Sequence, residues 1–204
     1  MILHQNNQEG QLSLDALRSG NREAFAKMVD LHSPMIYRLA YRMLGDAQEA
    51  EDVLQETFLN AYRHIASFEG RSSIKTWLYR IATNQALMRL RKRKPPTLSV
   101  HEEWVDDEGN EVPRELEDWC CLPEEEFMSS EVQTQLEVAT ERLSPALNAV
   151  FTLRDLHGLS TRETAGILNI SESAVKTRLL RARLELREAL SEYFIERVEV
   201  RRHG

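Results

Sequence analysis

An acidic run in the middle of the chain divides it into two parts. Residues 101–126 contain twelve aspartate or glutamate side chains and one arginine, Arg114. A segment with this charge and so few aliphatic residues cannot bury enough apolar surface to form a core. Pro95-Pro96 precede the run and end any helix before it, because proline lacks the backbone donor. We therefore predict a first domain over residues 1–94, a flexible acidic linker over residues 95–126 and a second domain over residues 127–204.

The acidic run also hides the charge of the rest of the protein. The net charge of the whole chain is −7 at pH 7, which by itself argues against a nucleic-acid binder. Without residues 101–126, however, the remaining chain is net positive by four charges. Charge separated in this way is typical of a nucleic-acid-binding protein with an acidic connector.

Elsewhere, apolar residues recur at intervals of three and four, which predicts an all-α protein with two small helical domains. In the first domain we predict a helix capped by Asn21, in which Pro34 causes a bend or a short break. Gly45-Asp46 then forms a stop and a new N-cap. Further helices are expected from about Ala47 to Ile65 and from about Ile74 to Arg93. The residues that the first of these two should bury are Ala50, Val53, Leu54, Phe58, Ala61 and Tyr62.

The second block, from about Phe127 to Ile195, is predicted to hold four helices. Ser160-Thr161-Arg162-Glu163 has the form of a capping box, and Ser144-Pro145 places a proline directly after a cap. The short helix after Ser160 should end at Asn169, a residue that tolerates the left-handed conformation of a tight turn. With Ile170 filling the corner and Ser171 capping the next helix, this layout predicts a helix-turn-helix.

The second helix of this motif separates apolar from polar residues. Val175, Leu179, Ala182 and Leu186 share one face. The residues predicted to contact DNA are Ser171, Ser173, Lys176, Thr177, Arg178 and Arg181. In this set Arg178, like Arg183 and Arg187, is better placed for phosphates than for base edges. The alternative is a plain antiparallel helix pair with a solvated basic face.

The predicted helix that begins at Asp46 is strongly acidic at its start. Its acidic residues are Asp46, Glu49, Glu51, Asp52 and Glu56, and no basic residue follows until Arg63. Acids near a helix N-terminus interact favourably with the helix dipole, so ordinary capping chemistry explains part of this pattern. The same residues also form a face that repels DNA and suits a basic protein partner.

The next predicted helix has the opposite charge. Eight basic residues and no acid lie between Arg71 and Lys94, and Trp77 and Tyr79 are placed among them. Aromatic rings beside cations are typical of single-stranded DNA binding, in which bases stack on the rings and phosphates bind the charges. Trp77 is equally well explained as a core residue, and both interpretations stay open at this point.

Three separated motifs then carry a resemblance to a known family. They are Asp46–Arg63 (DAQEAEDVLQETFLNAYR), Phe68–Asn84 (FEGRSSIKTWLYRIATN) and Leu143–Arg187 (LSPALNAVFTLRDLHGLSTRETAGILNISESAVKTRLLRARLELR). The chain resembles the extracytoplasmic-function class of sigma-70-type factors over about residues 20–94 and 127–192. The resemblance implies a region 2-type helical bundle and a region 4-type helix-turn-helix. It also implies a promoter-recognition subunit of bacterial RNA polymerase, with a role in the stress response.

The resemblance also implies roles for individual residues. The acidic helix matches the segment that docks on the clamp coiled coil of the polymerase β′ subunit, and the β flap is the second implied contact on the core enzyme. The implied docking residues are Asp46, Glu49, Asp52, Gln55 and Glu56. The loop Glu69–Ile74 matches the loop that captures a flipped non-template base of the −10 element. The residues implied at the −10 element are Glu69, Gly70, Arg71, Ser72, Ser73, Lys75, Trp77, Arg80 and Asn84.

The helix-turn-helix matches the reader of duplex DNA at the −35 element, and an anti-sigma factor is the implied inhibitor. The linker matches the segment that threads toward the RNA exit channel. Two features depart from the family pattern. Leu180 stands where members often carry a polar or aromatic residue, and the linker is longer and more acidic than expected.

Two other function classes remain as alternatives. An autonomous helix-turn-helix regulator would use residues 144–190 but leave the acidic helix and the segment Phe68–Asn84 without a role. A nuclease would need a metal site, but the six histidines are scattered and lack metal-ligand spacing. We therefore expect no enzyme activity, no cofactor and no metal.

Three further expectations concern the compartment and the cysteines. The polar segment Met1–Leu12 does not resemble a signal peptide, and no stretch approaches the roughly 20 apolar residues that span a bilayer. The protein should therefore act in the bacterial cytoplasm, associated with the nucleoid and without membrane insertion. Adjacent Cys120 and Cys121 are expected to be reduced thiols, with a redox switch or a metal site completed by a partner as alternatives.

Overall fold

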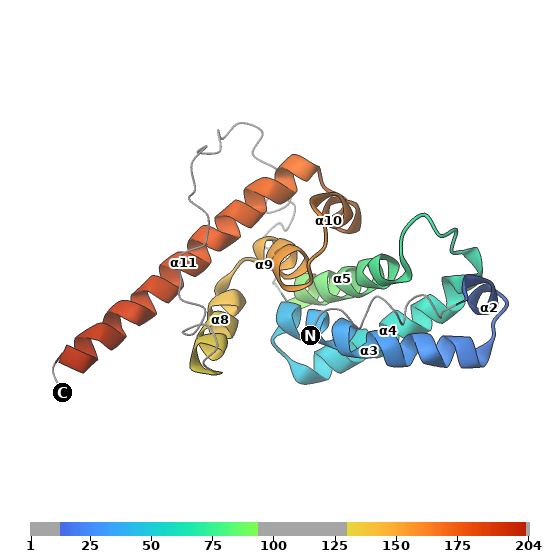
Figure 1. The fold of residues 1–204 in the computed structure, drawn as a ribbon, viewed down its shortest axis with the longest axis horizontal. Helices are drawn as coiled ribbons and strands as arrows, with labels where there is room; N and C mark the ends of the chain where they lie inside the picture. The colour runs from blue at the N-terminus through green and yellow to red at the C-terminus, as the bar shows by residue number, and fades with distance from the viewer. Residues whose placement is uncertain (1–12, 94–129, 203–204) are drawn as a thin grey trace. The chain divides into compact units, whose positions relative to one another are not determined.

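The computed structural model describes residues 13–93 and 130–202, and every regular element in these two ranges is helical (Figure 1). The chain divides into two compact units, Met1–Arg93 and Lys94–Gly204. The prediction of an all-α protein is confirmed. The acidic run with Cys120 and Cys121 lies outside the described residues. None of the described helices is long and apolar enough to cross a membrane.

The first unit is a bundle of three long helices with a short helix before it. The three are α3 (Arg22–Leu44), α4 (Ala47–His64) and α5 (Ile74–Arg93), and each packs against the other two. The short helix α2 (Leu14–Arg18) packs on α3 and on the 3-10 turn η1 (Ile65–Ser67), which follows α4. The fully buried side chains at the centre of the bundle include Met28, Ile36, Leu39, Val53, Leu78 and Tyr79.

The helix boundaries of this unit follow the predicted caps. The Asn21 side chain accepts a hydrogen bond of 3.0 Å from the Ala24 amide at the start of α3. Gly45 ends α3 in the left-handed conformation, with φ of 67°, and Asp46 then caps α4 by accepting 2.8 Å from the Glu49 amide. These two starts and the stop between them are confirmed. The predicted break at Pro34 is absent: α3 continues through this residue, which is exposed.

Tyr62 is a correction to the predicted core. Its side chain is 51% exposed, whereas Ala61 beside it is completely buried. Successive residues of an α-helix are rotated by about 100°, so Tyr62 falls beyond the edge of the buried face of α4. Its ring instead meets the ring of Phe25 edge-on, with centroids 5.1 Å apart. The aromatic pair therefore covers the flank of the bundle.

The second unit is built around one long helix, α11 (Glu172–Arg202). Three shorter helices pack on it, namely α8 (Ser130–Arg142), α9 (Pro145–Phe151) and α10 (Thr161–Leu168). A π-helical turn, η2 (Thr152–Leu156), extends α9. Ser144 caps α9, and Ser160 with Glu163 forms the complete capping box of α10. The prediction of four helices in this block is confirmed.

A buried histidine makes the stability of the first unit sensitive to acid. His32 is 1% exposed, and neither ring nitrogen has a hydrogen-bond partner among the described residues. Burial, helped by the positive charge of Lys75, lowers the pKa of His32 from 6.5 to about 4. The neutral ring is therefore favoured in the folded protein, and its contribution to stability is full above pH 6.5 and is lost as the pH falls toward 4.

We expect the free energy of unfolding to fall by about 3 kcal/mol from this group between pH 6.5 and 4. The variant His32→Leu keeps the apolar volume and cannot titrate, so its stability should decline less over the same range. Urea unfolding of both proteins at several pH values measures the difference between their free energies of unfolding. The other titrating groups are the same in both proteins, so their contributions cancel in this difference. A difference that stays constant from pH 7 to 4 would contradict this assignment.

Candidate functional site

In the second unit, α10 and α11 form the predicted helix-turn-helix. Asn169 adopts the left-handed conformation with φ of 55°, and the next amide, of Ile170, donates 3.1 Å to the carbonyl of Ala165. The Ser171 hydroxyl then accepts 3.1 Å from the Ala174 amide and so caps α11. The turn, its left-handed residue and the cap are where the sequence predicts them. The two helices are thereby held across a three-residue turn.

The first turns of α11 present a polar outer face. Ser173, Lys176 and Arg181 are exposed and Thr177 is partly exposed, whereas Val175, Leu179 and Ala182 are buried on the opposite side. At the N-terminus of this face the hydroxyls of Ser171 and Ser173 lie 2.8 Å apart. Hydroxyl and cationic donors near the start of such a helix suit the base edges of a major groove.

Arg178 does not lie on this outer face. Only 7% of it is exposed. It stands three residues after Val175 and four before Ala182, so the helical repeat places it on the buried stripe. This burial argues against the position that the sequence predicted for Arg178, which was a contact with phosphates.

Arg183 forms hydrogen bonds within the second unit. Its Nε and Nη2 atoms each donate 2.9 Å to the carboxylate of Asp155, in the π-helical turn η2. The hydrogen bond to Asp155 raises the pKa of Arg183 above its ordinary value. This two-point contact ties η2 to α11 and leaves less of the guanidinium for a phosphate.

In the first unit, the predicted loop leads directly into an exposed face of α5. Glu69, Gly70, Arg71, Ser72 and Ser73 are all exposed, and Gly70 has a positive φ of 76°. The Ser73 hydroxyl accepts 3.0 Å from the Thr76 amide, which starts α5. Along α5, the exposed Arg80 and Asn84 follow Trp77 at helical spacing. The exposed loop therefore leads into a helix that carries further exposed polar residues.

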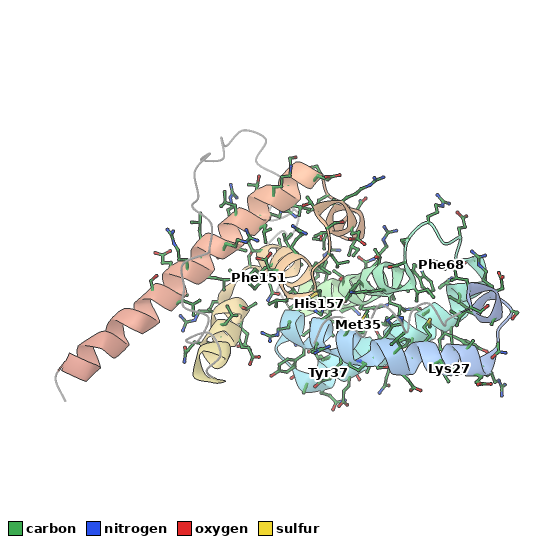
Figure 2. The ribbon with its side chains drawn as sticks, in the orientation of Figure 1. Lys27, Met35, Tyr37, Phe68, Phe151 and His157 are labelled. Carbon is green, nitrogen blue, oxygen red and sulfur yellow. The ribbon has the colours of Figure 1, made fainter. Side chains whose placement is uncertain are left out.

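The aromatic residues of α5 have different positions. Trp77 is half-buried, and its ring packs on Phe68 with centroids 4.9 Å apart (Figure 2 labels Phe68). Tyr79 is 1% exposed and belongs to the core, so the prediction that bases could stack on its ring is wrong. Lys75 lies 5.9 Å above the Tyr79 ring. Trp77 is therefore the one ring of this pair that reaches the surface.

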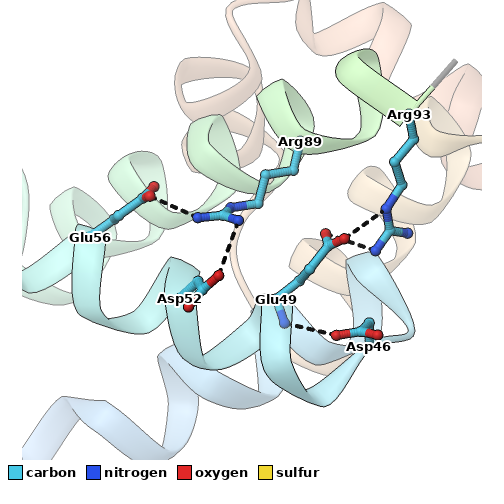
Figure 3. Close-up of polar contacts among 6 residues, drawn as sticks. All are labelled: Asp46, Glu49, Asp52, Glu56, Arg89 and Arg93. Carbon is cyan, nitrogen blue, oxygen red and sulfur yellow. Dashed lines mark hydrogen bonds and ion pairs between the residues drawn. The ribbon is translucent and has the colours of Figure 1, made fainter. Parts of the chain in front are cut away.

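The acidic face of α4 is paired with α5 (Figure 3). Arg89 Nη2 lies 2.7 Å from Glu56 and Arg89 Nη1 lies 3.5 Å from Asp52. One turn later, Arg93 Nη2 lies 2.7 Å from Glu49, and Arg93 Nη1 donates 3.0 Å to the carbonyl of Leu44. The carboxyl side chains of Asp52 and Glu56 stay nearly half exposed, at 45% and 46%. They can therefore still meet a partner.

The sequence prediction missed these ion pairs, although a signal was present. Glu49, Asp52 and Glu56 repeat at three and four residues, and Arg89 and Arg93 repeat at four. Two helices that pack side by side bring such stripes together. The predicted docking face and the predicted cationic helix are therefore in contact, through Arg89 and Arg93.

Comparison with known proteins identifies both units. Residues 28–95 match the family model described as Sigma-70 region 2, and residues 133–186 match the one described as Sigma-70, region 4. The chain is 38% identical to the ECF RNA polymerase sigma factor SigW of Bacillus subtilis over 174 residues, which cover 85% of this chain and 92% of SigW. It is 33% identical to the RNA polymerase sigma-H factor of Pseudomonas aeruginosa, covering 90% of this chain and 94% of that protein.

Solved structures show the same fold. The sigma factor RpoE of Bartonella quintana, crystallised with the anti-sigma factor NepR, is 27% identical, with a TM-score of 0.60 over 82% of this chain and 96% of that one. CnrH, solved with the cytosolic domain of CnrY, is 22% identical and has a TM-score of 0.62 over 88% of this chain and 95% of its own. The CnrH match concerns the fold alone.

Proposed function

Because this chain belongs to the extracytoplasmic-function group of the sigma-70 family, we propose that its two units divide promoter recognition between them. As a sigma factor it binds core RNA polymerase and promoter DNA and directs transcription initiation, and it is not an enzyme. The roles assigned below to individual residues are our proposal. The observation that carries it is that the exposed loop Glu69–Ser73 leads into α5, where Arg80 and Asn84 are also exposed.

We assign docking on the core enzyme to the outer face of α4. Asp52, Gln55 and Glu56 lie at helical spacing, and all three are at least partly exposed. Glu49 and the capping residue Asp46 extend the same acidic surface toward the helix N-terminus. A basic partner such as the clamp coiled coil of β′ would complement these carboxylates, with Arg89 and Arg93 as internal neighbours. The β flap is the partner that we propose for the second unit.

We assign the −10 element to the loop and α5. An extruded base costs a few kcal/mol to unstack and unpair, and contacts in the loop must offset that cost. The exposed Glu69, Gly70, Arg71, Ser72 and Ser73 supply polar groups for this purpose, and Trp77 supplies the neighbouring ring. Along the helix, Lys75, Arg80 and Asn84 extend the surface for the non-template strand.

We assign the −35 element to the start of α11. Ser171, Ser173, Lys176, Thr177 and Arg181 remain in this assignment, because each is at least partly exposed at the N-terminal half of the helix. Arg178 is excluded from it by its burial. Base edges of duplex DNA in the major groove are the contacts that fit this arrangement.

The test of the whole assignment is transcription reconstituted with purified core polymerase. Promoters selected from random DNA by the holoenzyme should contain two conserved elements, and initiation should require the sigma factor. A protein that shifts duplex DNA alone but directs initiation from no promoter would contradict the assignment and favour an autonomous regulator.

The loop itself gives a sharper prediction. Replacing Glu69, Arg71 and Ser72 together by alanine should lower the rate of promoter opening by about 10- to 100-fold, because the captured base loses its contacts. These side chains are exposed, so folding should be preserved. Permanganate reactivity of unpaired thymines measures opening. Glu23→Ala, also exposed but on α3, is the control and should open promoters normally.

Two further proposals concern inhibition by an anti-sigma factor and the location of the protein in the cell. We propose that an anti-sigma factor holds this protein inactive, as the anti-sigma factor NepR is bound to the sigma factor RpoE of Bartonella quintana. A sigma factor acts on DNA in the cytoplasm, and association with the nucleoid is our proposal for this chain. Purification of the tagged protein from cells that are not producing its transcripts should recover the inhibitor as a stoichiometric partner.

A further inference from the structure

The short helix α2 contacts the segment that leads into the loop Glu69–Ser73. We propose that Arg18, the last residue of α2, is a positioning residue that holds this loop in the shape needed for base capture. The proposal rests on the proposed role of the loop at the −10 element. It gives α2, which neither family model match includes, a part in promoter recognition.

Two hydrogen bonds from one guanidinium carry the proposal. Arg18 Nε donates 2.8 Å and Arg18 Nη2 donates 2.6 Å to the carbonyl oxygen of Phe68, fifty residues away in the sequence. The same Nη2 atom lies against the turn, since a Cβ added to Gly70 would be 3.7 Å from it. Arg18 therefore binds the last residue before the loop, and its guanidinium lies near the left-handed residue within it.

The remaining anchors of the loop lie at its two ends. Before the loop, the Phe68 ring packs on Trp77. After it, Ser73 caps α5 through the Thr76 amide. Between these points Glu69 pairs with Arg71, and both side chains are mostly exposed. Arg18 therefore adds an anchor from outside the loop, at the Phe68 carbonyl.

Helix α2 is suited to this task because it is itself fixed by packing. A helix of five residues has little stability of its own. Leu17 is 1% exposed, and α2 packs on η1 and α3. Figure 1 shows α2 beside the end of α4, where η1 and the loop begin. Leu17 thus faces the core while its neighbour Arg18 reaches the loop.

A preformed loop captures a base more effectively than a mobile one. Ordering backbone on binding costs roughly 1–2 kcal/mol per residue, and this cost is subtracted from the contacts with the correct base. Since the fork of Arg18 fixes the carbonyl of Phe68 before DNA arrives, its loss should weaken selection of the base. Affinity for phosphates in general should not change.

The experiment compares matched and mismatched −10 elements with reconstituted holoenzyme. The ratio of the opening rates on the two promoters reports base selection. We expect Arg18→Ala to lower this ratio about tenfold. Arg18→Lys keeps one charged donor without the fork, so it should restore the ratio in part. Arg22→Lys, an exposed arginine in the first turn of α3, is the matched control and should keep the ratio of the wild type.

Several outcomes would overturn the proposal. If Arg18→Ala slowed opening equally on both promoters and reduced the salt dependence by about one charge, Arg18 would be a phosphate contact instead. If Arg18→Ala kept the wild-type ratio while the first unit stayed folded, Arg18 would have no positioning role. Binding of core polymerase and the thermal midpoint, measured for each variant, show whether the first unit is still folded.

The loop variant separates this inference from the proposed function. If alanines at Glu69, Arg71 and Ser72 lower the ratio and Arg18→Ala does not, the loop selects the base and Arg18 is unimportant. If the loop variant leaves the ratio unchanged, the proposed role of the loop fails, whatever Arg18 does.

Discussion

Replacing Glu56 by lysine is expected to weaken binding of core RNA polymerase by about 10- to 100-fold. In the structure the Glu56 carboxylate lies 2.7 Å from Arg89 and its side chain is 46% exposed, so a basic partner can approach it from outside. A lysine at this position would add a positive charge beside Arg89 and repel that partner. Titration of labelled protein with core enzyme at low and moderate salt measures the loss, which salt should reduce.

The control for this prediction lies on the same helix. Glu51→Lys makes the same change of charge at an exposed position, which the helical repeat rotates by about 140° from Glu56. Glu51 is therefore separate from the docking face, although the sequence pattern grouped it with the other acids. Glu51→Lys should leave binding within about twofold of wild type, the scale of an exposed charge that contacts nothing. Equal losses in the two variants would show that only total charge matters. Wild-type binding by Glu56→Lys would show that the core enzyme docks elsewhere.

Replacing Arg89, the ion-pair partner of Glu56, should not weaken binding of core polymerase. Arg89→Ala removes the guanidinium that pairs with Asp52 and Glu56, so both carboxylates become free for a basic partner. We expect core binding to be unchanged or tighter, with unfolding made easier by up to about 1 kcal/mol, the usual scale of a half-exposed pair. Weaker binding by this variant would mean that the ion pair, and not the free acids, shapes the docking surface.

Local features of the fold were predictable because they depend on neighbours in the sequence. Asn21, Asp46 and Ser160 cap helices through amides three residues away, and Asn169 supplies a left-handed turn within its own backbone. The start of α5 at Ile74 also follows from the polar loop before it. Such signals do not depend on how the helices pack.

The errors arose where packing decides the outcome. Tyr79 and Arg178 both lie on helices rich in cations, and a charge pattern cannot show that their own faces turn inward. The pairing of Arg89 with Asp52 and Glu56 joins two helices that were interpreted separately. Arg18 gave no signal at all, because its partner is a backbone carbonyl fifty residues away.

Removing the side chain of Lys176 is expected to relax the base preference of the −35 element at one position. Lys176 is exposed in the first turns of α11, whereas Val175 directly before it is buried. A side chain of this kind that contacts guanine is worth about 1–3 kcal/mol of discrimination, or roughly 5- to 150-fold. Lys176→Ala holoenzyme should therefore use the selected promoter more weakly. On promoters that already carry another base at the contacted position, Lys176→Ala should reduce transcription only slightly.

Arg187 provides the comparison, since it is exposed further along the same helix. If it contacts a phosphate, Arg187→Ala should weaken all promoters equally and reduce the salt dependence by about one charge, with every base preference retained. Transcription from a library of −35 variants, with both holoenzymes and at two salt concentrations, separates the two effects. Lys176→Ala and Arg187→Ala each remove one positive charge. If both variants lost the same transcription activity on every promoter, α11 would bind DNA without reading its sequence. A change of preference at one position, seen with Lys176→Ala alone, would place the outer face of α11 against the base edges.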